Sequence, residues 1–287
     1  MNLIFEKITH LFDPLHHLWE HDKLHNKISL FLVLFFLAGV FCIELKRLGL
    51  ITGAPAQFIP RSHFSAIEAA FTVVLILEVI SLIFTLPCSF SRSVGKQFEL
   101  LSLILLRNAF KELSDFPQPI SFAGNEEAIL RIVTDGFGAL VIFGLLGLYY
   151  LIQDKKPDEP MRSIDLFRFV AAKKAIALLL LAAFASMGLR SLWLSLSGIP
   201  HTDFLHDFYT LLILADVLVV LISQCFQPGF YAVFRNSGFA LSTMLIRIAL
   251  AAPPFFNVLL GIAAAVFAIV LTIISRKLFK NKSFQEH

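Results

Sequence analysis

The sequence predicts an all-α integral membrane protein with about eight transmembrane helices. It predicts that these helices form two parallel tandem four-helix repeats, residues 28–152 and 175–275, after an N-terminal amphipathic helix. Of the 287 residues, 57% are hydrophobic and only 16% are charged, which is too apolar for a soluble domain of this length. Apolar stretches of about 20 residues recur along the chain, and each is long enough to cross a hydrocarbon core of about 30 Å.

Residues 1–27 form a His-rich leader that we expect to lie in the cytoplasm or at the membrane interface. Its apolar residues gather on one side of a helix, as is typical of interfacial helices; they are Leu11, Phe12, Leu15, Leu18 and Trp19. On a continuous helix, His17, His21 and His25 would share another face at i, i+4 and i+8. Three such imidazoles can bind zinc or another divalent ion, and the alternative is a plain interfacial helix. No organic cofactor is implied.

Eight segments are expected to span the membrane. They are residues 28–45, 65–86, 94–113, 130–152, 175–196, 204–223, 230–251 and 255–275. The third and the seventh contain charged residues, so either could instead lie in the interface as an amphipathic helix. We expect both to span; in the third segment, residues 100–106 are apolar except for Ser102.

The basic residues predict the orientation in the membrane. With eight spans, 16 Lys and Arg fall on the side that holds both termini, the linker 153–174 and the tail 276–287, and 5 fall on the other side. Lys and Arg are enriched in cytoplasmic loops. We therefore expect an inner or plasma membrane protein with both termini in the cytoplasm.

Corresponding residues recur in the two halves of the chain. Glu78 in the second span matches Asp216 in the sixth at an offset of 138, and Arg107 in the third matches Arg247 in the seventh at an offset of 140. An Ile-Pro pair also precedes the second helix of each half. Because each unit has an even number of spans, the two copies are expected to be parallel, related by an axis near the membrane normal.

Acidic and basic residues inside these spans are expected to pair. A charge at the centre of a span costs about 2.5 to 3.5 kcal/mol on insertion scales, so it normally has a partner. The spacing along neighbouring helices predicts an inner layer of Glu78 with Lys96 and Asp216 with Arg235, and an outer layer of Glu68 with Arg107 and Asp207 with Arg247. These pairs either fix helix packing or take part in moving or sensing charge.

Two functions follow from this pattern. In the first, the repeats move or sense protons or other ions, with Glu78 and Asp216 as the proton or cation sites. In the second, the chain is a non-catalytic membrane subunit or anchor, whose leader and linker bind a cytoplasmic partner or other membrane subunits. The spacing contains no nucleophile with its base and no Asp-rich metal site, so we do not expect an enzyme.

Other classes have little support. The net charge is only +3 and the basic residues form no continuous patch, which argues against nucleic-acid binding. The fourth spans lack the regularly spaced Arg or Lys residues that a voltage sensor needs. The three cysteines show no CxxC spacing, so neither a disulfide framework nor a zinc ribbon is indicated.

Overall fold

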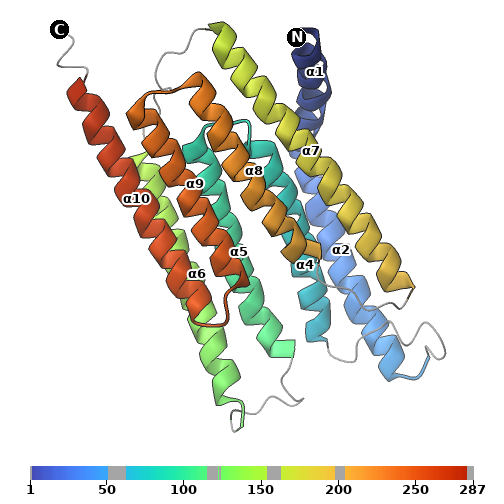
Figure 1. The fold of residues 1–287 in the computed structure, drawn as a ribbon. Coiled ribbons are helices and arrows are strands. Elements are labelled where there is room, and N and C mark those ends of the chain that lie inside the picture. Colours follow the sequence, from blue (N-terminus) through green and yellow to red (C-terminus); the bar gives the residue numbers. More distant parts are fainter. Residues whose placement is uncertain are drawn as a thin grey trace.

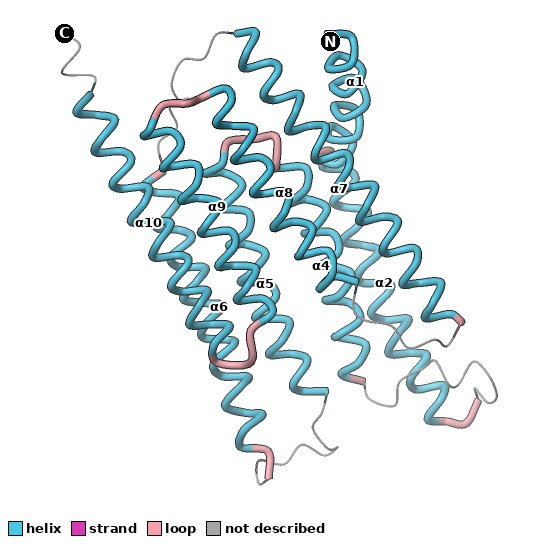
Figure 2. The backbone as a smooth tube through the Cα atoms, in the orientation of Figure 1, coloured by secondary structure: helices cyan, strands magenta, loops and turns pink. Residues whose placement is uncertain are grey.

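The computed structural model describes residues 2–50, 63–114, 122, 124–153, 163–197 and 204–282, and within these residues it contains helices and turns but no strand (Figure 2). The helices are α1 (Asn2–Trp19), α2 (Asp22–Arg47), α4 (Phe64–Thr85), α5 (Phe90–Ser114), α6 (Glu126–Ile152), α7 (Ser163–Leu196), α8 (Phe204–Phe226), α9 (Phe230–Ala251) and α10 (Phe256–Lys282). The expected all-helical architecture is confirmed for this part of the chain.

The helices from α2 to α10 lie side by side, and the chain reverses direction from each one to the next (Figure 1). One end of this bundle holds α1, the turn at Cys88 between α4 and α5, and the turn at Gln227 between α8 and α9. We call it the α1 end. The turns at Asn125 and Pro254 lie at the opposite end.

Six helices are long and apolar enough to cross a membrane, namely α2, α4, α6, α7, α8 and α10. The chain is therefore a multi-pass membrane protein, because bilayer-spanning helices of this length satisfy all of their backbone hydrogen bonds internally. α5 and α9 are less apolar. Each packs between two of the apolar helices, α5 between α4 and α6, and α9 between α8 and α10.

The order of neighbouring helices is the same in both halves, with α2, α4, α5 and α6 in contact in sequence, and α7, α8, α9 and α10 likewise. Two hydrophobic clusters join the halves. One contains Val79 of α4 and Phe208 of α8, and the other contains Leu101 of α5, Ile142 of α6 and Ala264 of α10. The halves therefore share their cores.

Glycine allows α6 and α10 to approach closely. A Cβ on Gly138 of α6 would lie 2.5 Å from Val258 of α10, and one on Gly261 of α10 would lie 2.8 Å from Ile142 of α6. Small residues at such crossings let membrane helices pack backbone to backbone.

The leader and the linker differ in detail from the sequence-based expectation. α1 ends at Trp19, and its Phe12 is buried against Phe84 at the end of α4, with ring centroids 5.7 Å apart. The second half of the linker is helical, because α7 begins at Ser163. An ion pair of 2.6 Å between Lys174 of α7 and Asp13 of α1 fastens the leader to the bundle.

Candidate functional site

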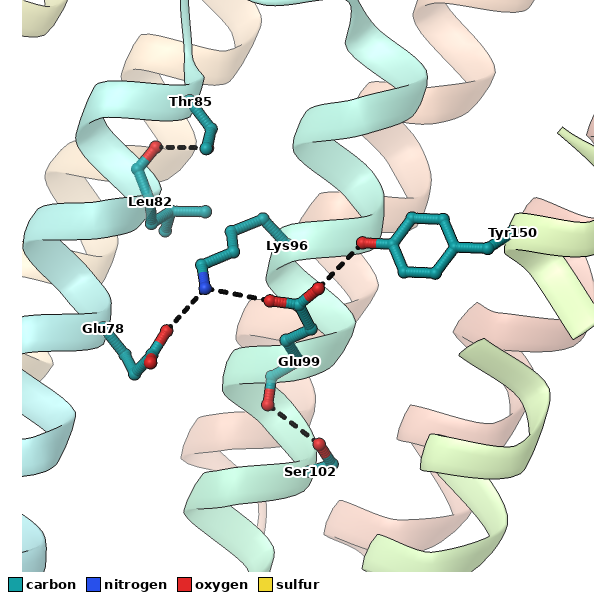
Figure 3. A network of polar contacts seen from close by, with 7 residues as sticks. All are labelled: Glu78, Leu82, Thr85, Lys96, Glu99, Ser102 and Tyr150. Carbon is teal, nitrogen blue, oxygen red and sulfur yellow. Dashed lines mark hydrogen bonds and ion pairs between the residues drawn. The ribbon is translucent and has the colours of Figure 1, made fainter. Parts of the chain in front are cut away.

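Four polar side chains from α4, α5 and α6 form a connected network (Figure 3). Lys96 Nζ lies 2.8 Å from Glu78 Oε2 and 2.8 Å from Glu99 Oε2. Tyr150 donates a hydrogen bond of 2.9 Å to Glu99 Oε1. The predicted contact between Glu78 and Lys96 is present, and Glu99 and Tyr150 extend it to a third helix.

Lys96 contacts both carboxylates at the same distance. Its ammonium donates a hydrogen bond to Glu99 Oε2 and forms an ion pair with Glu78 Oε2. One ammonium also cannot neutralise two carboxylates. When all three groups are ionised, the network has excess negative charge, which favours the binding of a proton or a cation.

Sequence reasoning did not assign Glu99 or Tyr150 to this site. Glu99 could have been found, because residues three apart face the same way on a helix and Glu99 follows Lys96 at that distance. No comparable spacing connects Tyr150 to the site, since it comes from another helix.

In the second half, Asp216 of α8 pairs with Arg247 of α9. Arg247 Nη2 and Nε lie 2.8 and 3.2 Å from Asp216 Oδ2. The arginine side chain is only 2% exposed and the aspartate side chain 16%. This is the most deeply buried ion pair in the part of the chain that the structure describes.

The expected pairing of Asp216 with Arg235, and of Asp207 with Arg247, is therefore wrong. Side chains on a helix lean toward its N-terminus. Because α8 and α9 run in opposite directions, Asp216 and Arg247 lean toward each other, whereas Arg235 leans toward the α1 end. Arg235 contacts the side chain of the neighbouring residue Asn236 instead.

The predicted outer pair of Glu68 and Arg107 is also absent from the described contacts. Arg107 has a buried Nε without a hydrogen-bond partner there. Glu68 uses its backbone carbonyl to accept a hydrogen bond from Thr72. The outer layer of the predicted ladder is therefore not formed in either half.

A small cavity with a mostly apolar lining borders Asp216. Its volume of about 20 Å³ is enough for about one water molecule. Polar residues from three further helices line it, namely Ser93 of α5, Lys173 of α7 and Thr243 of α9. Lys173 is 4% exposed and donates to the Cys88 carbonyl at 2.9 Å.

The sequence did not identify Lys173, because its position at the end of a basic segment is typical of a solvated linker. In the structure its ammonium lies over the rings of Phe90 and Phe169, 4.7 and 4.5 Å from their centroids. Such cation–π contacts stabilise a desolvated ammonium. The sequence does contain one sign of this contact, because Phe169 and Lys173 are four residues apart and so share a face of the helix.

The histidine face expected in the leader is interrupted. α1 ends before His21, whose ring centroid is 6.3 Å from that of His17. The side chain of His25 lies outside what the structure describes. Among the residues that the structure describes, no three His, Cys, Asp or Glu side chains are grouped so that they could hold a metal ion.

A second connection between the halves lies near the end opposite α1. Asn257 of α10 donates a hydrogen bond of 3.0 Å to Asp135 of α6, and both residues are buried.

The chain matches no protein-family model, and no curated protein or solved structure is significantly similar to it. The site must therefore be interpreted from its own chemistry.

Proposed function

We propose that this multi-pass membrane protein moves protons or small cations across a cell membrane and has no enzymatic activity. In this proposal α5 and α9 also span, which gives eight spans with both termini in the cytoplasm. The alternating direction of the helices supports this topology (Figure 1), and so does the excess of basic residues expected at the α1 end.

The cavity beside Asp216 is the observation on which the proposal rests. A carboxylate that only holds two helices together needs no water-sized space next to it. Asp216 instead faces a water-sized cavity that Lys173, Ser93 and Thr243 also line. A water there has several polar partners, and a hydrated carboxylate inside a membrane bundle can accept and release a proton.

The network around Lys96 supports the same proposal. Its two carboxylates, Glu78 and Glu99, share a single ammonium. We propose that Glu78 and Asp216 are the proton or cation sites of the two halves, and that the halves are copies of one four-helix unit. The equal order of helix contacts in each half agrees with such a duplication.

The proposal is tested by flux in vesicles reconstituted with the purified protein. Wild-type protein should carry protons, sodium or potassium down an imposed gradient. Asp216→Asn and Glu78→Gln should each abolish that flux. Adding Lys96→Met to the Glu78→Gln variant should not restore the flux. The matched control is Glu127→Gln, because the Glu127 side chain is 75% exposed and its partner among the described residues is Arg131.

Wild-type vesicles without flux of any of the three ions at either polarity would refute the proton or cation proposal. Equal flux in wild type and Asp216→Asn would refute the assignment of the site.

The second candidate function is a non-catalytic subunit of a larger membrane complex. The observation that favours it is the exposure of α2. Only 6% of the residues in its most apolar segment are buried, whereas 22 to 44% are buried in the other candidate spans. Such a helix is available to pack against another membrane protein. If flux is absent, crosslinking in the native membrane through a photoreactive residue at Phe31 or Phe41, which are 56 and 63% exposed, should capture that partner.

A further inference from the structure

We infer that Glu78 has two counter-ions, Lys96 and Arg107, and exchanges between them. The structure holds the first state, in which Glu78 is paired with Lys96. In the second state Arg107 takes the place of Lys96. For its role in flux the inference rests on the proposed function, but the existence of two pairings can be tested without any flux.

The distribution of charge in the first state is uneven. Lys96 is shared by two carboxylates, whereas the Nε of Arg107 is buried without a hydrogen-bond partner among the described residues. If Glu78 moves to Arg107, Lys96 keeps its hydrogen bond to Glu99. Each carboxylate then has one cation, which removes the excess negative charge around Lys96 and brings a carboxylate to Arg107, whose buried Nε has no hydrogen-bond partner among the described residues.

Lys96 keeps a carboxylate partner when Glu78 leaves. Its ammonium lies 2.8 Å from each of the two carboxylates (Figure 3). Glu99 is three residues from Lys96 on the same helix, where side chains at this spacing are neighbours. The loss of Glu78 therefore does not leave the ammonium without a counter-ion.

The second half already contains the corresponding pairing. Asp216 matches Glu78 in the sequence, and its partner Arg247 matches Arg107. Arg107 and Arg247 each stand 17 residues after the first residue of their helices, α5 and α9. The acid of the second half is thus held by the counterpart of Arg107, for which the described residues show no ion pair.

The geometry of α4 and α5 allows the exchange. Phe71 of α4 stacks on Phe110 of α5 with ring centroids 5.0 Å apart, which sets the register of the two antiparallel helices. Glu78 lies seven residues from Phe71 toward the α1 end, and Arg107 lies three residues from Phe110 in the same direction. Their Cα atoms are therefore within about two helical turns along the bundle. Their side chains lean toward each other, because each leans toward the N-terminus of its own helix.

A double-mutant cycle on the full-length protein in lipid nanodiscs tests the inference, with the melting temperature as the readout. Glu78→Gln and Arg107→Gln are made singly and together, in the wild type and in a Lys96→Met background. If Glu78 serves Lys96 alone, the two shifts add in both backgrounds. Exchange predicts that the double variant in the Lys96→Met background melts at least about 2 °C above the value expected from addition.

The double variant should melt above the additive value because Glu78→Gln removes the carboxylate that Arg107→Gln alone would leave without a counter-ion. In the wild type the same deviation should be smaller, since Lys96 competes for the carboxylate. Glu68→Gln is the matched control, because Glu68 lies on the same helix ten residues away. Its shift should add to that of Arg107→Gln.

Additive shifts for Glu78 and Arg107 in the Lys96→Met background would overturn the inference. So would a deviation found with Glu68, because Glu68 would then be the partner of Arg107. If Arg107→Gln yields no folded protein, Arg107→Met, which also removes the charge, takes its place and is judged by the same criterion. Since no flux is measured, failure here leaves the transport proposal standing, and loss of flux elsewhere leaves this result unaffected.

Discussion

Gly95 of α5 and Tyr150 of α6 pack so closely that no side chain fits between them. A Cβ on Gly95 would lie 2.6 Å from the Tyr150 hydroxyl oxygen and 2.7 Å from its Cε1. The tyrosine ring therefore lies directly against the backbone of α5, which brings its hydroxyl to Glu99 four residues further along. The absence of a side chain at position 95 is what connects α6 to the charged network.

Gly95→Ala should displace Tyr150 and break its hydrogen bond to Glu99. Alanine favours the helix by about 0.5 to 1 kcal/mol, but overpacking of this kind costs about 1 to 3 kcal/mol. We expect a net loss of stability, seen as a melting temperature lowered by a few degrees in nanodiscs. Tyr150→Phe should add little in this background, because the hydrogen bond is already lost.

Gly144→Ala on α6 is the control for this substitution, because nothing lies within 4 Å of a Cβ at that position. It should leave the melting temperature unchanged or raise it slightly. Equal melting temperatures for the two alanine variants would show that Tyr150 is not held against Gly95.

Removing Arg247 should destabilise the protein strongly. Arg247→Met leaves the buried carboxylate of Asp216 unpaired, and breaking a buried pair in this way costs about 3 to 5 kcal/mol. The double variant with Asp216→Asn should be milder than Arg247→Met alone, since it strands no charge. Thermal unfolding of the three variants provides the measurement.

The comparison variant is Arg47→Met, whose partner is Glu44. Both of these side chains are about half exposed, at 56 and 46%, so their pair should contribute about 1 kcal/mol or less. If Arg247→Met is no more harmful than Arg47→Met, the pair with Asp216 is not a buried one in the membrane.

The topology can be tested by labelling single cysteines. In a variant with Cys42, Cys88 and Cys225 replaced by serine, Ser89→Cys lies before α5 and Glu126→Cys lies after it, and both positions are exposed. If α5 spans, a membrane-impermeant maleimide should label position 89 from the cytoplasmic side and position 126 from the other side. Labelling of both positions from one side would remove α5 from the spans.

The position of a residue along a membrane-spanning helix predicts how deep it lies in the membrane. This depth alone predicts part of the candidate site. The contact of Glu78 with Lys96 and the burial of Asp216 both follow from where these residues fall within their apolar segments. The composition likewise predicts the six apolar helices, because an apolar segment of about 20 residues has few stable alternatives to a membrane-spanning helix.

Spacing does not determine which of two cations an acid contacts. Asp216 pairs with Arg247 because the side chains of these two residues lean toward each other. The position of Tyr150 depends on a close helix contact at Gly95, and Lys173 depends on two aromatic rings from different helices. These features arise from three-dimensional packing, and a single sequence contains no direct record of it.

Asn257 should be essential for joining the two halves at the end opposite α1. Its side chain donates to Asp135 at 3.0 Å and accepts the backbone N–H of Val258 at 2.7 Å, near the start of α10. Asn257→Leu removes both bonds and strands a buried carboxyl group and a helix N–H. An unsatisfied buried group costs about 1 to 3 kcal/mol, so we expect the melting temperature to fall by several degrees.

Replacing both partners should repair most of this damage. In the double variant of Asn257→Leu with Asp135→Leu, no polar side chain remains unsatisfied, and only the helix N–H is still without its cap. The double variant should therefore melt above Asn257→Leu alone. Asn108→Leu, an asparagine substitution on α5 away from this contact, should change the melting temperature little. If the double variant melts below both single variants, each residue stabilises the protein by its own contacts, and the hydrogen bond between Asn257 and Asp135 is not what couples α6 to α10.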